Sequence, residues 1–368
     1  MTFQPDSKHM LDVLANRRPA RLPIYEHIIS PAIMEQILGV QFAPLEQSTG
    51  RDLDEFFKQY CRFWPAMTYD TVSFEVCITE NLPQHGAILG GKGPIQNPAD
   101  LERYPWDELE ARFWAVADGK FAALRRNLPP GLKALGGIGN GLLEISEDLV
   151  GFESLAYLAA DYPETFAEVY RRAGDLMVAL WTEFLRRYAD DFVICRFGDD
   201  LGFRSNTLIS PKLIRQHILP QYRRVISLIK AAGKPFLWHS CGRIFAIMDD
   251  VIALGIDAKH SNEDAIAPYD EWIARYSERI GLLGGIDLDI LCQKAPADIT
   301  AEVVEKGRRY RATARGYALG SGNSIPDYVP LDGYLAMIEG ARRIREEEVF
   351  PITGNHNRKG IHGEMYWL

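Results

Sequence analysis

The sequence lacks any apolar run approaching about 18 residues, the length that a bilayer-spanning helix needs. Residues 1–21 are polar and lack the apolar core of a secretory signal peptide. Positive charge is also scarce, because 41 Lys and Arg face 50 Asp and Glu, a formal net charge of -9. Phosphate backbones are bound by clustered Lys and Arg. We therefore expect a cytoplasmic protein that binds neither nucleic acid nor a membrane.

Cysteine is scarce as well, with five residues spread over a chain of 368. An odd number of widely spaced cysteines in a chain this large does not indicate a disulfide framework. One of them, Cys241, follows His239 by two positions, and His-x-Cys is a potential metal-binding pattern. No Gly-x-Gly-x-x-Gly motif follows the first predicted strand, which argues against a dinucleotide-binding sheet.

The sequence does contain a repeated alternation of short apolar or β-branched runs with longer helical patterns, which is typical of parallel β-α units. The predicted strands are Leu22–Ile29, Thr71–Val76, Leu132–Gly137, Asp191–Gly198, Pro235–His239, Ile256–Ser261, Arg279–Gly285 and Gly316–Leu319. The clearest predicted helices are Pro163–Tyr188, Pro211–Ala231 and Ile244–Ala253. Eight strands predict an α/β fold, a single (β/α)8 TIM barrel, with an open doubly wound sheet as the alternative.

The composition, 47% hydrophobic and 25% charged residues, is that of a globular protein with a substantial core. Such barrels extend from roughly 200 to over 400 residues as one unit, so the length permits a single domain. We expect the barrel to span residues 1–350, with helical insertions in Pro94–Leu128 and a C-terminal tail over residues 351–368.

Polar side chains are concentrated just after the predicted strands, where a parallel barrel places its active site. They are Glu26, His27, Glu75, Asn140, Asp199, Asp200, His239, Cys241, His260, Asn262, Glu263, Asp287 and Asn323. Alternation at a strand end can point His239 and Cys241 the same way, although such a pair also occurs by chance. Glu263 lies 22 residues after Cys241, at the end of the following strand. His, Cys and Glu would leave an open zinc position for substrate; the alternative for Glu263 is a loop that caps the next helix.

Two carboxylates, Asp199 and Asp200, lie between Gly198 and Gly202. Glycines allow a ligand to approach the backbone, so one carboxylate is predicted to bind substrate or to act as general acid or base. Helix capping or pairing with an Arg is the alternative. The loop Gly320–Pro326 has the flexible backbone of a ligand-cradling turn, and it equally fits an ordinary glycine-rich loop.

These motifs resemble the uroporphyrinogen decarboxylase superfamily, and the likeness covers nearly the whole chain. Its specific parts are Gly198–Gly202 with Ile209–Pro211, His239–Gly242, Gly284–Asp287, and Gly320–Pro326 with Tyr328–Pro330. The superfamily also holds methyltransferases that move methyl groups between corrinoid proteins and thiols such as coenzyme M. The resemblance implies a (β/α)8 barrel, in agreement with the strand count.

The resemblance also implies a zinc site. Methyltransferases of the superfamily hold zinc through a His-x-Cys pair, here His239 and Cys241, and a later Cys after the last strand. At that later position this chain has Asn323 or a neighbour in Ser321–Ser324. The zinc site of cobalamin-independent methionine synthase looks similar, with a Glu 22 positions beyond the Cys, and this likeness implies Glu263 as the third ligand.

True uroporphyrinogen decarboxylases carry an N-terminal Arg-rich motif that grips substrate carboxylates, whereas this chain has Leu22–His27 there. The resemblance therefore implies a zinc-assisted methyltransferase acting between a corrinoid and a thiol or similar acceptor. The chain has no Asp-x-His-x-x-Gly cobalamin-binding segment, so the corrinoid (cobalamin) would arrive on a partner protein or as a free ligand.

The predicted residues divide into two sets by role. The predicted catalytic residues are Asp199, Asp200, His27 and His260, with the histidines available for proton transfer; the predicted substrate-binding residues are Glu26, Asn262, Asp287 and Asn323. Two alternatives stay open. One is a metal-independent decarboxylase of uroporphyrinogen or a smaller carboxylic acid that uses Asp200 and Arg204, and the other is a barrel that binds a corrinoid without turning it over.

Overall fold

The computed structural model describes residues 3–349, so the predicted tail over 351–368 lies outside the described residues. Within residues 3–349, seven parallel strands form one sheet in which each strand pairs with the next along the chain. They are β1 (Val72–Cys77), β2 (Ala134–Gly139), β3 (Phe192–Gly198), β4 (Phe236–His239), β5 (Ala258–His260), β6 (Gly281–Ile286) and β7 (Tyr317–Ser321). This sequential parallel order confirms the predicted TIM-type α/β fold.

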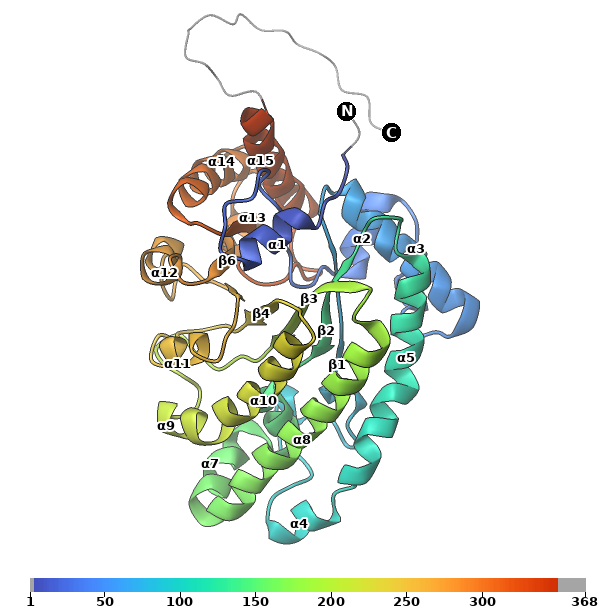
Figure 1. Cartoon of the computed structure of the whole chain (residues 1–368), viewed down its shortest axis with the longest axis vertical. Coiled ribbons are helices and arrows are strands. Elements are labelled where there is room, and N and C mark those ends of the chain that lie inside the picture. The colour runs from blue at the N-terminus through green and yellow to red at the C-terminus, as the bar shows by residue number, and fades with distance from the viewer. Residues whose placement is uncertain (1–2, 350–368) are drawn as a thin grey trace, which may run out of the picture.

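Parallel neighbours need a crossover after each strand, and helices supply it around the outside of the curled sheet (Figure 1). The helices are α1 (Lys8–Leu14), α2 (Pro31–Leu38), α3 (Gly50–Ala66), α4 (Pro98–Arg103), α5 (Leu109–Asn127), α6 (Leu142–Val150), α7 (Phe152–Asp161), α8 (Pro163–Tyr188), α9 (Pro211–Leu213), α10 (Leu219–Ala231), α11 (Met248–Ile252), α12 (Tyr269–Tyr276), α13 (Leu288–Gln293), α14 (Pro296–Thr313) and α15 (Leu331–Val349). Helix α8 packs on β2, α10 on β4, and α14 on β6 and β7. No helix within residues 3–349 is both long and apolar enough to cross a membrane.

The first predicted strand, Leu22–Ile29, differs from the expectation because it forms only isolated bridges. Ile24 pairs with Leu319 and Ile29 with Ile325, both in parallel orientation. An ideal Cβ at Gly320 would lie 1.8 Å from the carbonyl oxygen of Tyr25, so only glycine allows this close approach. The segment therefore lies beside β7 in place of an eighth strand, and a few backbone hydrogen bonds, such as those of the Tyr25 N–H to the Leu319 carbonyl and the Ser30 N–H to the Ile325 carbonyl, replace a regular ladder.

Two predicted helices are interrupted. Between α9 and α10 the helix takes a π-helical turn over Ile214–Ile218, because Pro220 has no amide hydrogen to donate to the preceding turn. The predicted helix Ile244–Ala253 is regular only over Met248–Ile252, since Ile244 and Ile247 are buried in an irregular turn. The predicted insertion Pro94–Leu128 is helical, as α4 and α5.

The barrel interior is filled by one apolar side chain from the segment Leu22–Ile29 and one from each of the strands β2 to β7. These residues are Tyr25, Leu135, Ile194, Leu237, Ala258, Leu283 and Ala318, and they form one cluster with Met10, Val13 and Leu14 of α1. Helix α1 therefore closes the end of the barrel at which the strands begin. The opposite end, where the strands finish, is left for polar groups.

Candidate functional site

A polar layer lies directly above this apolar layer. Side chains alternate along an extended chain, so a residue two positions further points to the same side. The apolar and polar members are Tyr25 and His27, Ile194 and Arg196, Leu237 and His239, and Ala258 and His260. All four polar side chains are buried. Inward-facing side chains two positions apart are thus apolar in the middle of the barrel and polar nearer the carboxyl ends of the strands.

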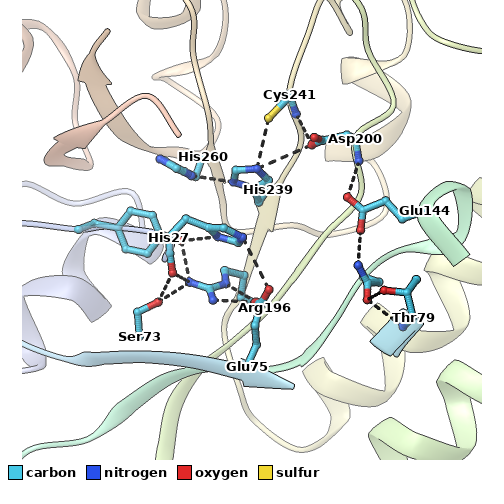
Figure 2. A network of polar contacts seen from close by, with 12 residues as sticks. His27, Ser73, Glu75, Thr79, Glu144, Arg196, Asp200, His239, Cys241 and His260 are labelled. Carbon is cyan, nitrogen blue, oxygen red and sulfur yellow. Dashed lines mark hydrogen bonds and ion pairs between the residues drawn. The ribbon is translucent and has the colours of Figure 1, made fainter. Parts of the chain in front are cut away.

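Three histidines of this layer touch one another (Figure 2). The rings of His27 and His239 stack with centroids 3.9 Å apart, and His239 and His260 are 4.9 Å apart. Burial lowers the pKa of His27 and His239 well below 6.5 and that of His260 to about 3, and the charge of Arg196 lowers all three further. The cluster is therefore neutral at physiological pH, as metal ligation requires.

Arg196 is the fixed cation of the layer. It has no exposed surface and donates to Glu75 Oε2 at 2.7 and 3.0 Å, to the Tyr25 hydroxyl at 3.0 Å and to the carbonyl of His27 at 3.1 Å. It also donates to Ser73 Oγ at 2.7 Å, and Ser73 Oγ in turn donates to the His27 carbonyl at 2.6 Å. The network joins the first segment to β1. Sequence reasoning missed Arg196, although a charge at an inward position of an apolar strand was a usable signal.

Cys241 lies where the polar layer reaches the barrel mouth. Its Sγ is 3.4 Å from His239 Nε2, and it accepts hydrogen bonds from Ser261 Oγ at 3.4 Å and Asn323 Nδ2 at 3.6 Å. Its backbone N–H donates to Asp200 Oδ1 at 2.9 Å. Burial, followed by the charge of Asp200, raises the pKa of the thiol well above 9.0. Asn323 thus stands beside this sulfur, where the resemblance implied a cysteine.

Two groups of three ligand atoms within 4.8 Å of one another occur in the described residues: His27, His239 and His260, and Asp200, His239 and Cys241. The second group combines oxygen, nitrogen and sulfur donors, all of which zinc accepts, and three protein ligands leave a fourth position open. This donor set therefore fits a zinc ion. Glu263, the predicted third ligand, belongs to neither group, and its role in coordination stays a prediction.

The structure separates the two predicted carboxylates. Asp199 has no exposed surface and accepts hydrogen bonds from the backbone of Leu143 at 2.9 Å and of Glu144 at 3.0 Å, as well as from the Tyr222 hydroxyl. An ideal Cβ at Gly141 would lie 2.2 Å from its Cβ. Burial raises the pKa of Asp199 to about 6, although these bonds oppose the rise. Its contacts are those of the helix-capping alternative, at the start of α6.

Asp200 faces the mouth, with 45% of its side chain exposed. Its Oδ1 is 3.8 Å from His239 Nε2, and its backbone N–H donates to Glu144 Oε1 at 3.3 Å (Figure 2). Glu144 also accepts from Asn140 Nδ2 at 2.7 Å. Burial, followed by the charges of Asp199 and Asp200, raises the pKa of Glu144 well above 4.5. Sequence reasoning missed Glu144, because it lies on α6 and not at a strand end.

Three further predicted residues, Glu26, Asn262 and Asp287, accept hydrogen bonds from backbone N–H groups. Glu26 has no exposed surface and accepts the Ser321 N–H at 2.8 Å. The Asn262 side-chain oxygen accepts the Gly285 N–H at 2.8 Å, and its Nδ2 has no partner within residues 3–349. Asp287 caps α13 and accepts the Asp264 N–H at 2.6 Å. Their predicted contacts with substrate stay predictions.

A buried lysine lies behind Cys241 and was missed from the sequence. Lys259 is 3% exposed, and its ammonium lies 3.9 Å from the ring centroid of Trp272 and donates to the Ser261 carbonyl. Ser261 adopts a φ of 102°, which is rare for a residue with a side chain. Burial lowers the pKa of Lys259 to about 7. Lys259 therefore helps to hold the backbone from which Ser261 reaches the sulfur.

Comparison with known proteins gives one family and similar folds. Residues 91–344 match the uroporphyrinogen decarboxylase (URO-D) family. A methyltransferase from Methanosarcina mazei is similar at 16% identity and a TM-score of 0.70, over 92% of this chain and 98% of that one. A B12-independent methionine synthase from Shewanella sp. W3-18-1 is similar at 13% identity and a TM-score of 0.52, over 92% and 99%. No curated protein sequence matches the chain.

At these identities the two structures support the fold alone. The family match is independent of them and covers well over half of the chain, including β2 to β7 and every residue from Asp199 to Asn323 in the site. The chain therefore belongs to the uroporphyrinogen decarboxylase family.

Proposed function

We propose that the protein is a zinc-assisted methyltransferase that moves a methyl group between a corrinoid and a thiol or similar acceptor. The observation that carries the proposal is the group of Asp200, His239 and Cys241 at the barrel mouth, whose ligand atoms lie within 4.8 Å of one another. When bound there, zinc would lower the pKa of an acceptor thiol and present it as a thiolate.

In the forward direction, the sulfur of the thiolate forms a bond to the methyl carbon. The bond between that carbon and the corrinoid cobalt breaks, and its electron pair stays on the cobalt. The chain itself orients the groups: Asp200 is held by the Cys241 N–H, and Ser261 and Asn323 donate to the Cys241 sulfur. Because the sequence has no cobalamin-binding segment, the corrinoid would be a substrate, either free or carried by a partner protein.

The buried charges support this choice over a decarboxylase that grips several substrate carboxylates. Such a substrate needs free cations at the mouth. Arg196, the cation of the polar layer, is paired with Glu75 through two hydrogen bonds. In the segment Leu22–Ile29, the buried carboxyl of Glu26 occupies the region in which decarboxylases carry their Arg-rich motif.

The first test is the metal content of protein purified without added metal. We expect about one zinc per chain in the wild type and in Cys292→Ser, a control at a half-buried cysteine on α13. Cys241→Ser should lose the metal. Absence of metal from the wild type, or equal metal in Cys241→Ser, would contradict the zinc site.

The second test is turnover. Incubation with methylcobalamin and a panel of thiols should give demethylated corrinoid, whose absorption spectrum differs from that of the methylated form, and Cys241→Ser should abolish the change. Incubation with uroporphyrinogen should give no coproporphyrinogen. Coproporphyrinogen formation would overturn the proposal in favour of the decarboxylase, and a thiol panel without demethylation would also count against it.

A further inference from the structure

His260 is tied to β7 by one of its ring nitrogens. Its Nε2 lies 3.0 Å from the carbonyl oxygen of Ser321. A carbonyl oxygen only accepts, so His260 Nε2 must carry the hydrogen. The adjacent buried guanidinium of Arg196 disfavours a second positive charge in this layer. In the resulting neutral ring, Nδ1 presents a lone pair.

That lone pair faces His239. The two Nδ1 atoms are 2.8 Å apart, a distance at which one nitrogen must donate to the other (Figure 2). Because His260 Nδ1 carries no hydrogen, His239 Nδ1 is the donor. A neutral His239 then has its lone pair on Nε2, and this atom is the one that lies 3.4 Å from Cys241 Sγ and 3.8 Å from Asp200 Oδ1.

His27 does not compete for these atoms. Arg196 donates to the Tyr25 hydroxyl, which leaves the hydroxyl hydrogen to donate to His27 Nδ1 at 3.3 Å. His27 Nε2 then carries its hydrogen and faces Glu75 Oε1 at 3.7 Å. In the group of three histidines, the lone pairs of His27 and His260 are thus already engaged in hydrogen bonds. His239 Nε2 is turned away from that group, toward the mouth.

We propose that His260 is a positioning residue that fixes His239 in the tautomer with hydrogen on Nδ1, so that Nε2 is available to a metal at Asp200 and Cys241. Metal-binding histidines in general donate their other N–H to an oxygen acceptor that fixes the ring. Here the neutral imidazole of His260 is the acceptor, and its own tautomer is set by the hydrogen bond from its Nε2 to the Ser321 carbonyl. This inference rests on the proposed zinc-assisted function. It assigns His260 to positioning His239 and not to proton transfer.

A matched pair of variants of the full-length chain tests the role. His260→Asn keeps an acceptor oxygen near the place of Nδ1, whereas His260→Leu has a similar size and no acceptor. In metal-free protein with 15N-labelled histidine, NMR distinguishes a protonated from an unprotonated ring nitrogen, and His239→Gln identifies the signals of His239. We expect hydrogen on His239 Nδ1 in the wild type and in His260→Asn, and a mixture of tautomers in His260→Leu.

Zinc affinity, measured by competition with a chelator, provides the second measurement. We expect His260→Leu to bind zinc about 10-fold to 100-fold more weakly than the wild type, the usual loss when an outer-shell partner is removed, and His260→Asn to recover most of it. Wild-type zinc affinity in His260→Leu, or hydrogen on His239 Nε2 in the wild type, would overturn the inference. Zinc binding to the three histidines in Cys241→Ala, detected by shifts of the His27 and His260 signals, would overturn it too.

These results separate the two proposals. If the wild type binds no zinc, the zinc-assisted function fails, while the NMR signals of the metal-free protein still decide the tautomer of His239. If the wild type binds zinc and turns over but carries the other tautomer, only the role of His260 fails. His260→Leu leaves the N–H of His239 without its acceptor, which lowers the stability of that variant, and the tautomer of the wild type is measured independently of it.

Discussion

Replacing Glu26 with Gln should stabilise the protein at neutral pH and have little effect in acid. Glu26 has no exposed surface, and its side chain lies between the segment Leu22–Ile29 and β7. It accepts the Ser321 N–H at 2.8 Å and also accepts from the Ser321 hydroxyl. Burial raises the pKa of Glu26 from 4.5 to about 8, and the two hydrogen bonds from Ser321 only partly oppose that rise.

The sign and size of the effect follow from proton linkage. Between the unfolded pKa of 4.5 and the folded pKa of about 8, the unfolded chain has lost a proton that the folded chain keeps. The free energy of unfolding therefore falls as pH rises through this window, by about 1.4 kcal/mol per pH unit, and by about 3 kcal/mol at pH 7. Gln has no proton to lose, and it keeps an acceptor for the Ser321 N–H.

Equilibrium urea unfolding measures this difference at about pH 5 and about pH 7.5, where the wild type and Glu26→Gln should differ by less than about 1 kcal/mol and by about 4 kcal/mol respectively. Glu110→Gln, at an exposed position on α5, is the control and should match the wild type at both pH values. The reasoning is refuted if Glu26→Gln is less stable than the wild type near pH 7.5, or if the difference between them does not change with pH.

Three further predictions test the site and the elements that support it. Loss of an outer-shell partner weakens metal binding by about 10-fold to 100-fold, and Asp200→Asn should weaken zinc binding by more than this. Glu263→Gln should weaken it less than Asp200→Asn does, and the reverse order in a chelator competition would support Glu263 as the third ligand. Arg196→Met should lower the free energy of unfolding by about 3 to 5 kcal/mol in urea, because it leaves a buried carboxylate unpaired. Gly141→Ala should lower the melting temperature, since its Cβ would lie 2.2 Å from the side chain that caps α6, whereas Gly119→Ala in the middle of α5 meets only a 3.9 Å contact and should stabilise by about 0.5 to 1 kcal/mol. A melting temperature for Gly141→Ala at or above that of Gly119→Ala would contradict the packing argument.

Alternation of apolar runs with helical patterns predicted the barrel because it depends on local periodicity. Among the predicted strands within residues 3–349, the first differs from the expectation. Leu22–Ile29 has the apolar pattern of a strand, yet it forms only the bridges of Ile24 and Ile29. A strand pattern indicates that a segment is extended and buried. A ladder also requires a partner with the right register and backbone spacing, and here the partners Leu319 and Ile325 lie 295 and 296 positions further along the chain.

The sequence by itself determined the parts of this protein that depend on neighbours along the chain: the order of strands and helices, the family motifs, and the pair His239 and Cys241. Only the tertiary structure showed that Asp200 lies beside this pair. The reason is a backbone contact between two loops, since an ideal Cβ at Gly242 would lie 2.1 Å from the carbonyl carbon of Gly202. Such packing depends on the whole barrel, and no spacing along the chain encodes it.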